Sequence, residues 1–221
     1  MPTRLQIDFA SDVVCPWCAA GLGSLDLALQ RLQGEIEAEV RFQPFELNPD
    51  MPPEGEDITE HLARKYGSSA EQQAASWQAL RERASAVGFY FSEGGRGRTW
   101  NTFDAHRLLH WAGEHDAAGQ RRLKRALLEA YFSRAENVSD HEVLLSAVER
   151  AGLDATRARE ILASDAYAQE VREREAFYTE HGIRAVPSVI VNNRHLIQGG
   201  QPPEVFEQAL RQVAAGAPEA A

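Results

Sequence analysis

The chain has 221 residues, of which 43% are hydrophobic and 25% charged, proportions that are ordinary for a soluble globular protein. Its formal net charge of −10 at pH 7 would repel phosphate backbones and anionic lipid, so we expect neither nucleic-acid nor membrane-surface binding. The N-terminus carries no apolar signal-peptide segment, and no run of residues suits a membrane span. These observations predict a cytoplasmic protein.

The opening segment predicts a strand, a helix and a second strand. Residues 5–9 alternate so that their apolar side chains share one face of a strand. A helix is expected to begin at Pro16, because proline is favoured at the first helical position. Its apolar residues are spaced three and four apart: Cys18, Leu22, Leu25, Leu29 and Leu32. Residues 40–42 begin the second strand, in which Pro44 indicates a bulge or an edge position.

The middle of the chain predicts only helices. They cover residues 57–67, 69–88, 101–111, 121–132, 141–150, 155–162 and 167–180. Asp57 with Glu60 and Ser69 with Gln72 have the spacing of capping boxes at two of the helix starts. The glycine-rich residues 92–98 lack the lysine and hydroxyl pattern of a phosphate-binding loop, so we interpret them as a mobile loop near the site entrance.

The last part of the chain returns to strand. Residues 185–191 are apolar and β-branched, residues 192–194 suit a turn, and residues 195–197 form a second short strand. A final helix opens at residues 202–203, and the tail after Gly216 is expected to be disordered. The first and last segments therefore predict one mixed α/β sheet covered by helices, with an all-helical insertion between them.

Cys15 and Cys18 are the only cysteines in the chain, and they lie three residues apart at the predicted strand-to-helix junction. Two thiols at this spacing can form and break a disulfide within one helical turn. The free N–H groups of a helix start favour an anion, so Cys15 is predicted to be the attacking thiolate. Cys18 falls on the buried stripe and is predicted to resolve the mixed disulfide. The intervening Pro16 and Trp17 are expected to tune the redox potential.

Two other uses of the cysteine pair compete with redox chemistry. A zinc site needs two further ligands, and His106 with His110 could supply them, but a strand–CxxC–helix context favours redox exchange. An inert disulfide would close only a four-residue loop and gain little stability. The sequence therefore predicts no metal, and we expect no bound cofactor.

Four motifs spread over the chain resemble the thioredoxin superfamily. They are DVVCPWC at residues 12–18, NTFDAHR at 101–107, GIRAVP at 182–187 and GGQPPEVF at 199–206. With its helical insertion the chain looks like the DsbA-like branch, and it is similar to the FrnE-type cytosolic oxidoreductases of that branch. The resemblance implies an α/β thioredoxin-like domain built from residues 1–50 and 181–221, interrupted by a helical insertion domain at residues 51–180.

The resemblance also implies further site residues. Pro187 should follow a cis peptide bond and lie against the cysteine pair as part of the catalytic site. Val186 before it should expose a backbone edge that pairs with an extended substrate. Trp100, Asn101 and His106 follow the glycine-rich loop and are predicted to form a wall of the substrate groove from the helical insertion. Ordinary core and surface packing is the alternative for these residues, because apolar helix faces are usually core.

The function implied is that of a protein disulfide oxidoreductase acting on protein or small-molecule disulfides, with glutathione or thioredoxin as a possible recycling partner. Two alternatives stay open. One is a relative of the kappa-type glutathione transferases and isomerases, which typically carry a serine where Cys15 stands. The other is a redox-gated chaperone or sensor. The Pro-Trp dipeptide leaves open whether the protein oxidises, reduces or isomerises disulfides.

Overall fold

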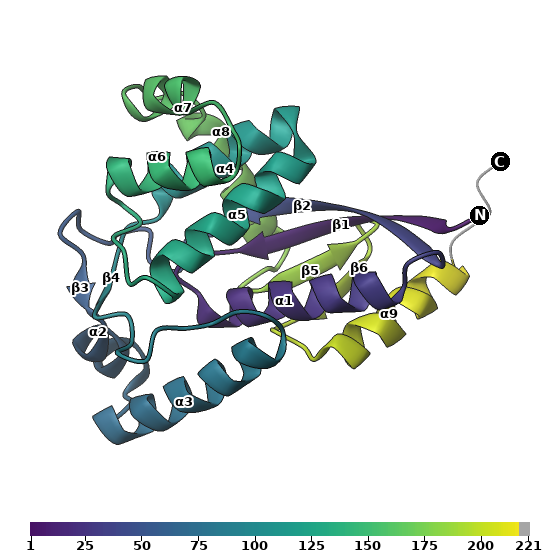
Figure 1. The fold of residues 1–221 in the computed structure, drawn as a ribbon, viewed down its shortest axis with the longest axis horizontal. Helices are drawn as coiled ribbons and strands as arrows, with labels where there is room; N and C mark the ends of the chain where they lie inside the picture. Colours follow the sequence, from purple (N-terminus) through teal and green to yellow (C-terminus); the bar gives the residue numbers. More distant parts are fainter. Residues whose placement is uncertain (217–221) are drawn as a thin grey trace.

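The centre of the molecule is a four-stranded mixed sheet. A computed structural model describes residues 1–216 of the chain. The strands, in their order across the sheet, are β2 (Ile36–Pro44), β1 (Thr3–Ser11), β5 (Ser188–Val191) and β6 (His195–Gln198). β1 pairs in parallel with β2 and antiparallel with β5, and β5 pairs antiparallel with β6 (Figure 1). The prediction of one mixed sheet formed by both ends of the chain is confirmed.

One face of the sheet carries the main core. The apolar residues of β1 lie opposite Ala38, Val40 and Phe42 of β2 in register. This face packs against α1 (Pro16–Arg31) and α9 (Pro203–Gly216), which lie side by side in Figure 1. The stripe predicted for α1 is buried as expected, with Leu22 and Leu25 at the centre. Each fully buried leucine contributes about 1.5–3 kcal/mol to stability.

The helical insertion packs against the edge strand β2. It comprises α2 (Ile58–Tyr66), α3 (Ala70–Ala86), α4 (Phe103–His115), α5 (Ala117–Phe132), α6 (His141–Arg150), α7 (Ala155–Leu162) and α8 (Ala168–Glu180). Helices α4, α5 and α8 all contact β2. One cluster of buried apolar side chains runs through both parts of the molecule without a break. We propose the division into residues 1–50 with 181–221 and residues 51–180 on topology, since the core does not separate them.

Several boundaries differ from the predicted ones. Helix α4 continues past Trp111 and α5 begins before Arg121, because neither Gly113 nor Gly119 interrupts its helix. Strand β5 begins at Ser188, since the proline that precedes it has no N–H to donate to a ladder. The predicted disorder after Gly216 falls outside the described residues.

A small sheet in the insertion was not predicted at all. Strand β3 (Glu56–Asp57) pairs antiparallel with β4 (Arg98–Thr99), far away in the sequence. Strands of two residues are too short to leave a periodic pattern, so the sequence gives no signal for them. Part of the loop predicted at residues 92–98 therefore belongs to a strand.

The local signals around prolines and caps are mostly borne out. Pro44 lies on the edge strand and pairs in register opposite Ser11, which selects the edge interpretation over a bulge. Ser69 and Gln72 form the complete capping box at the start of α3. Asp57 caps α2 by accepting hydrogen bonds from two backbone N–H groups, although a reciprocal bond from Glu60 is not part of that cap. Within residues 1–216, no helix is long and apolar enough to cross a membrane.

Gln120 joins the insertion to the sheet. Its side chain accepts a hydrogen bond from the N–H of Phe42 at 2.9 Å and donates to the carbonyl of the same residue at 3.0 Å. It also donates to the carbonyl of Leu109 at 3.0 Å. One buried amide thus satisfies backbone groups on the outer edge of β2, where a further strand would otherwise pair.

We expect Gln120→Ala to lower the free energy of unfolding by about 2–4 kcal/mol, because it leaves buried backbone groups of β2 without partners. Urea denaturation followed by circular dichroism measures this change. Gln78→Ala, at an exposed position of α3, is the matched control and should change stability by less than about 0.5 kcal/mol. Equal effects of the two substitutions would contradict the role assigned to Gln120.

Candidate active site

The cysteine pair lies at the start of α1. Cys15 is the residue that precedes the first helical turn, with an extended backbone (φ −90°, ψ 113°), and Pro16 occupies the first helical position. The Cys15 carbonyl accepts the N–H of Cys18 at 3.0 Å. Both cysteines are free thiols. Cys15 is 4% exposed and Cys18 is fully buried, so only the first thiol has any access to solvent.

The loop before β5 lies directly against Cys15. The Val186–Pro187 peptide bond is cis, as the resemblance implied. The Cys15 thiol lies 3.6 Å from the Val186 carbonyl oxygen, to which it can donate. Helix α1 approaches this loop so closely that a Cβ at Gly21 would lie 3.1 Å from Cγ of Pro187. Cys15 and Val186 are therefore in contact although they are 171 positions apart in the sequence.

Trp17 is held between two other parts of the chain. It is 42% exposed, and the Arg83 guanidinium lies 5.2 Å above its ring centroid. Arg83 also donates to the carbonyl of Gly200. A Cβ at Gly200 would lie 2.8 Å from the Trp17 carbonyl oxygen, so this close contact needs a glycine. The dipeptide between the cysteines is thus fixed by α3 and by the loop before α9.

A buried lysine lies behind the cysteine pair. Lys124 of α5 is 1% exposed, and its ammonium donates to the Ser11 carbonyl at 3.5 Å. Burial lowers the pKa of Lys124, while the nearby Cys18 thiol and Asp12 carboxyl oppose that shift. Burial, together with the hydrogen bond to Cys15, raises the pKa of Cys18 well above its usual value. Cys18 is therefore held as a protonated thiol that can donate to its neighbour.

Lys124 was missed by sequence reasoning, although a signal was present. It is a lysine on the apolar stripe of α5, spaced three and seven residues before the buried Leu127 and Tyr131. A charged residue on such a stripe is seldom fully buried unless it is paired. That pattern indicates that Lys124 has a buried polar or charged partner, but it does not identify the partner.

Asp12 completes the polar group behind the thiols. It is fully buried and accepts the N–H of Leu47 at 2.7 Å. Its other oxygen lies 3.4 Å from Nε2 of His106, which is 2% exposed. Burial acts to raise the pKa of Asp12, but the His106 contact, the Leu47 N–H and Lys124 together hold it below its usual value. Asp12 and Lys124 are thus an acidic and a basic group, both buried, that attract each other without a direct salt bridge.

A cavity of about 700 Å³ opens in front of Cys15. Pro16, Trp17 and Val186 also line it, so four of the predicted site residues meet there. Its other walls come from α2, α3, residues 45–48 and the loop that contains Arg96. The cavity thus lies between the thioredoxin-like part and the helical insertion.

Three predicted substrate-binding residues are not part of this lining. Trp100 packs against Gly55, on the small sheet. Asn101 accepts the N–H of Phe103 at the start of α4 and donates to the Met51 carbonyl at 3.3 Å. His106 is buried against Asp12 on the inner side. Their role in substrate binding stays a prediction.

The two histidines considered as metal ligands do not join the cysteines. His106 contacts Asp12, and His110 lies 3.6 Å from Glu114 on the same helix. Throughout residues 1–216, no three of the His, Cys, Asp and Glu side chains come together in an arrangement suited to a metal ion.

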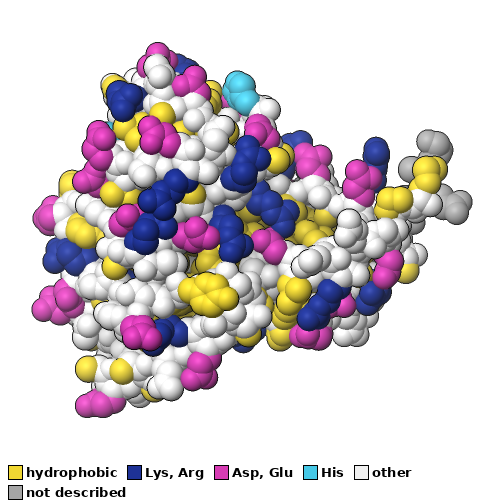
Figure 2. All heavy atoms as spheres, in the orientation of Figure 1, with side chains coloured by type: hydrophobic (Ala, Val, Ile, Leu, Met, Phe, Trp, Pro, Cys, Tyr) yellow, Lys and Arg dark blue, Asp and Glu magenta, His cyan; other side chains and the backbone are white. Residues whose placement is uncertain are grey.

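The residues that line the cavity are mainly basic, whereas the chain as a whole has a net negative charge. Lys65, Arg96 and Arg184 line it, with Glu46 as the acidic residue among its walls. Over the face in view in Figure 2, acidic and basic side chains are instead interspersed. A concave basic region favours an anionic group on the substrate.

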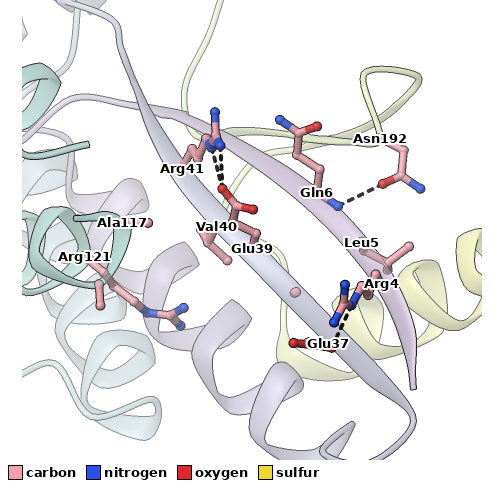
Figure 3. A pocket seen from close by; sticks show the side chains of 12 residues that line it. Arg4, Leu5, Gln6, Glu37, Glu39, Val40, Arg41, Ala117, Arg121 and Asn192 are labelled. Carbon is pink, nitrogen blue, oxygen red and sulfur yellow. Dashed lines mark hydrogen bonds and ion pairs between the residues drawn. The ribbon is translucent and has the colours of Figure 1, made fainter. Parts of the chain in front are cut away.

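A second groove, of about 810 Å³, contains neither cysteine. It extends across β1 and β2, from Asn192 near β1 to Ala117 and Arg121 of α5 (Figure 3). Two of its charge pairs are internal, Arg4 with Glu37 at 3.1 Å and Arg41 with Glu39 at 2.7 Å. Paired charges along an edge strand discourage pairing with another chain, and no nucleophile is among the lining residues.

These features define a thioredoxin-type site, with a CxxC pair at a helix start facing a cis-proline loop. The model of the DsbA-like thioredoxin domain matches residues 6–211, and the chain belongs to this family. It has the thioredoxin-like α/β fold with a helical insertion.

Individual relatives agree with this assignment. The chain is similar to a probable DsbA oxidoreductase from Streptomyces coelicolor, with 34% identity, a TM-score of 0.87, and coverage of 98% of this chain and 92% of that one. It is 27% identical to the uncharacterized protein YwbO of Bacillus subtilis over 93% of this chain and 96% of YwbO. The fold is also similar to that of the cytosolic disulfide reductase DsbM from Pseudomonas aeruginosa, solved with GSH, at 14% identity and a TM-score of 0.65, covering 95% and 99% of the chains.

Glu46 in the cavity wall makes the stability of the fold depend on pH. Its side chain is 1% exposed and is hydrogen-bonded to Arg172. Burial and the neighbouring Glu175 raise the pKa of Glu46 to about 7. A carboxyl whose pKa is higher in the folded state than in the unfolded chain stabilises the fold at low pH. That stability is lost as the pH rises from about 4.5 to about 7.

Glu46→Gln, which mimics the protonated form, should therefore be more stable than the parent protein by about 2 kcal/mol at pH 8. The gain should shrink as the pH falls to 4.5, where the parent carboxyl is protonated in the fold. Urea unfolding at several pH values measures the difference. Glu170→Gln, at an exposed position of α8, should show no such trend. A gain independent of pH would contradict the assignment.

Proposed function

We propose that the protein is a dithiol–disulfide oxidoreductase that uses Cys15 and Cys18 through a mixed disulfide. The observation that carries this proposal is the unequal placement of the two thiols. Cys15 lines the open cavity at the helix start, whereas Cys18 is buried behind it beside Lys124. One thiol can therefore meet a substrate, and the other can reach only its partner.

The exchange proceeds in two balanced steps when the substrate is a disulfide. The Cys15 thiolate attacks one substrate sulfur, the substrate S–S bond breaks, and the second sulfur leaves with the electron pair. Cys18 then loses its proton and attacks Sγ of Cys15, which releases the first sulfur and forms the Cys15–Cys18 disulfide. Two electrons pass from the protein dithiol to the substrate. The reverse sequence oxidises a substrate dithiol.

The loop at Val186 is suited to hold the substrate chain. Its carbonyl lies beside the Cys15 thiol, and the residue is only partly buried. An extended peptide whose cysteine reaches Cys15 would run past this backbone and could bond to it. Such main-chain recognition accepts many sequences, which suits an enzyme for protein disulfides as well as small ones.

We infer that the protein is of the FrnE type and acts in the cytoplasm. A low-molecular-weight thiol such as glutathione, or a thioredoxin, would recycle it. The basic residues Lys65, Arg96 and Arg184 in the cavity support an anionic thiol. The equilibrium potential of the Cys15–Cys18 couple decides the direction, since a value near about −270 mV is that of thioredoxin and one near about −120 mV is that of DsbA.

Cys15→Ser should abolish reduction of insulin by the protein and dithiothreitol, because the attacking sulfur is lost. Cys18→Ser should instead accumulate a mixed disulfide with the substrate, visible by mass spectrometry, because the resolving thiol is missing. Both proteins should keep the parent circular dichroism spectrum. Insulin reduction by Cys15→Ser at the parent rate, or a Cys18→Ser protein that forms no adduct with its substrate, would contradict the proposal.

A further inference from the structure

The cavity contains a histidine that the mechanism above does not use. His61 lies on the inner face of α2, together with Ile58, Leu62 and Lys65, which also line the cavity. This spacing of three, four and seven residues places one side of the helix toward the cavity, which Cys15 also lines. The His61 side chain is 9% exposed, so the ring is largely enclosed.

A carboxylate fixes the orientation of this ring. Oε2 of Glu56 lies 2.6 Å from Nδ1 of His61 and is also bonded to Arg64. Hydrogen bonds from His61 and Arg64 lower the pKa of Glu56, so the carboxylate is ionised and can only accept. Nδ1 must therefore carry a proton. The other ring nitrogen, Nε2, makes no hydrogen bond with any side chain or backbone group of residues 1–216.

The unpredicted small sheet holds Glu56 in place. Glu56 lies opposite Thr99 in the β3–β4 pair. Gly55 before it has φ +64°, and a Cβ there would collide with the Thr99 carbonyl oxygen, so only glycine permits the approach. Arg98 donates to the carbonyls of Glu54 and Gly55. In Figure 1 this sheet and α2 are grouped at the end of the molecule where α1 begins.

The other polar groups of the cavity are unsuited to proton transfer. Arg96 and Arg184 stay protonated. The Lys65 ammonium is bonded to the Leu47 carbonyl and to Asn48. Burial and the nearby Cys15 raise the pKa of Tyr66, which keeps its proton. Glu46 also lines the cavity, but its Oε1 is buried and its Oε2 is bonded to Arg172. An imidazole held by a carboxylate, by contrast, can both donate and accept.

We propose that His61, positioned by Glu56, is the proton-transfer group for the substrate sulfur. This inference rests on the proposed function. As Cys15 attacks a substrate disulfide, the S–S bond breaks and the departing sulfur takes the electron pair. Nε2–H of the protonated His61 gives its proton to that sulfur, which leaves as a neutral thiol. In the reverse direction, neutral Nε2 accepts the proton of the incoming thiol.

A pair of uncharged disulfides separates this role from a structural one. The sulfur leaving bis(4-nitrophenyl) disulfide is weakly basic and departs without a proton, whereas the aliphatic sulfur leaving bis(2-hydroxyethyl) disulfide gains from one. The pre-reduced protein is mixed with excess of either disulfide at pH 7, and the loss of its thiols is timed. His61→Gln should react at least about tenfold more slowly with the aliphatic disulfide but at the parent rate with the aromatic one.

Further variants complete the test. Glu56→Gln should show a smaller loss of the same kind, since Nε2 stays in place but the ring is less well oriented. His195→Gln, on the exposed strand β6, should match the parent with both disulfides. Equal slowing of both reactions by His61→Gln, or no slowing of either, overturns the role of His61 while leaving the oxidoreductase intact. A parent protein whose thiols react with neither disulfide overturns the proposed function itself.

Discussion

The contact between the start of α1 and the Val186–Pro187 loop is the constraint on which the rest of the site depends. It brings the Cys15 thiol to the Val186 carbonyl and leaves little room for a side chain at Gly21, which faces Pro187. Because α1 and α9 pack on the same face of the sheet, the core itself fixes how the helix meets this loop. The reactive thiol is positioned by the packing of the whole domain and by no flexible segment.

The helical insertion contributes charged and titratable side chains near the thiols, and it also forms part of the cavity wall. Helix α5 ties itself to the edge strand through Gln120 and, one turn later, places the Lys124 ammonium behind Cys18. Helix α2 brings His61 to the opposite, open side of the thiols. In the proposed function, the thioredoxin-like sheet with its CxxC helix carries out the exchange of sulfurs. The insertion would then surround that reaction with charged groups and with the proposed proton-transfer group.

Much of the fold around the cysteine pair could be predicted from the sequence. The alternation in β1, the stripe of α1 and the position of Pro16 were sufficient to place the two cysteines at a helix start with the second one buried. The short strands β3 and β4 were not predictable, since two residues leave no period. Two of the residues predicted to form the substrate groove, Trp100 and Asn101, do not line the cavity. Both follow a loop whose path depends on that same small sheet.

The sequence by itself determined the fold through the motifs at both ends of the chain. It also led to the proposed reaction class, because two lone cysteines at a strand-to-helix junction favour redox exchange over other uses. Only the tertiary structure decided which charged groups surround the thiols. Lys124, Asp12, Glu46 and His61 lie on four separate segments, and only Lys124, on the apolar stripe of α5, carries a local sequence signal. Their effect on the site comes from burial and from distances between segments, and local sequence patterns record neither.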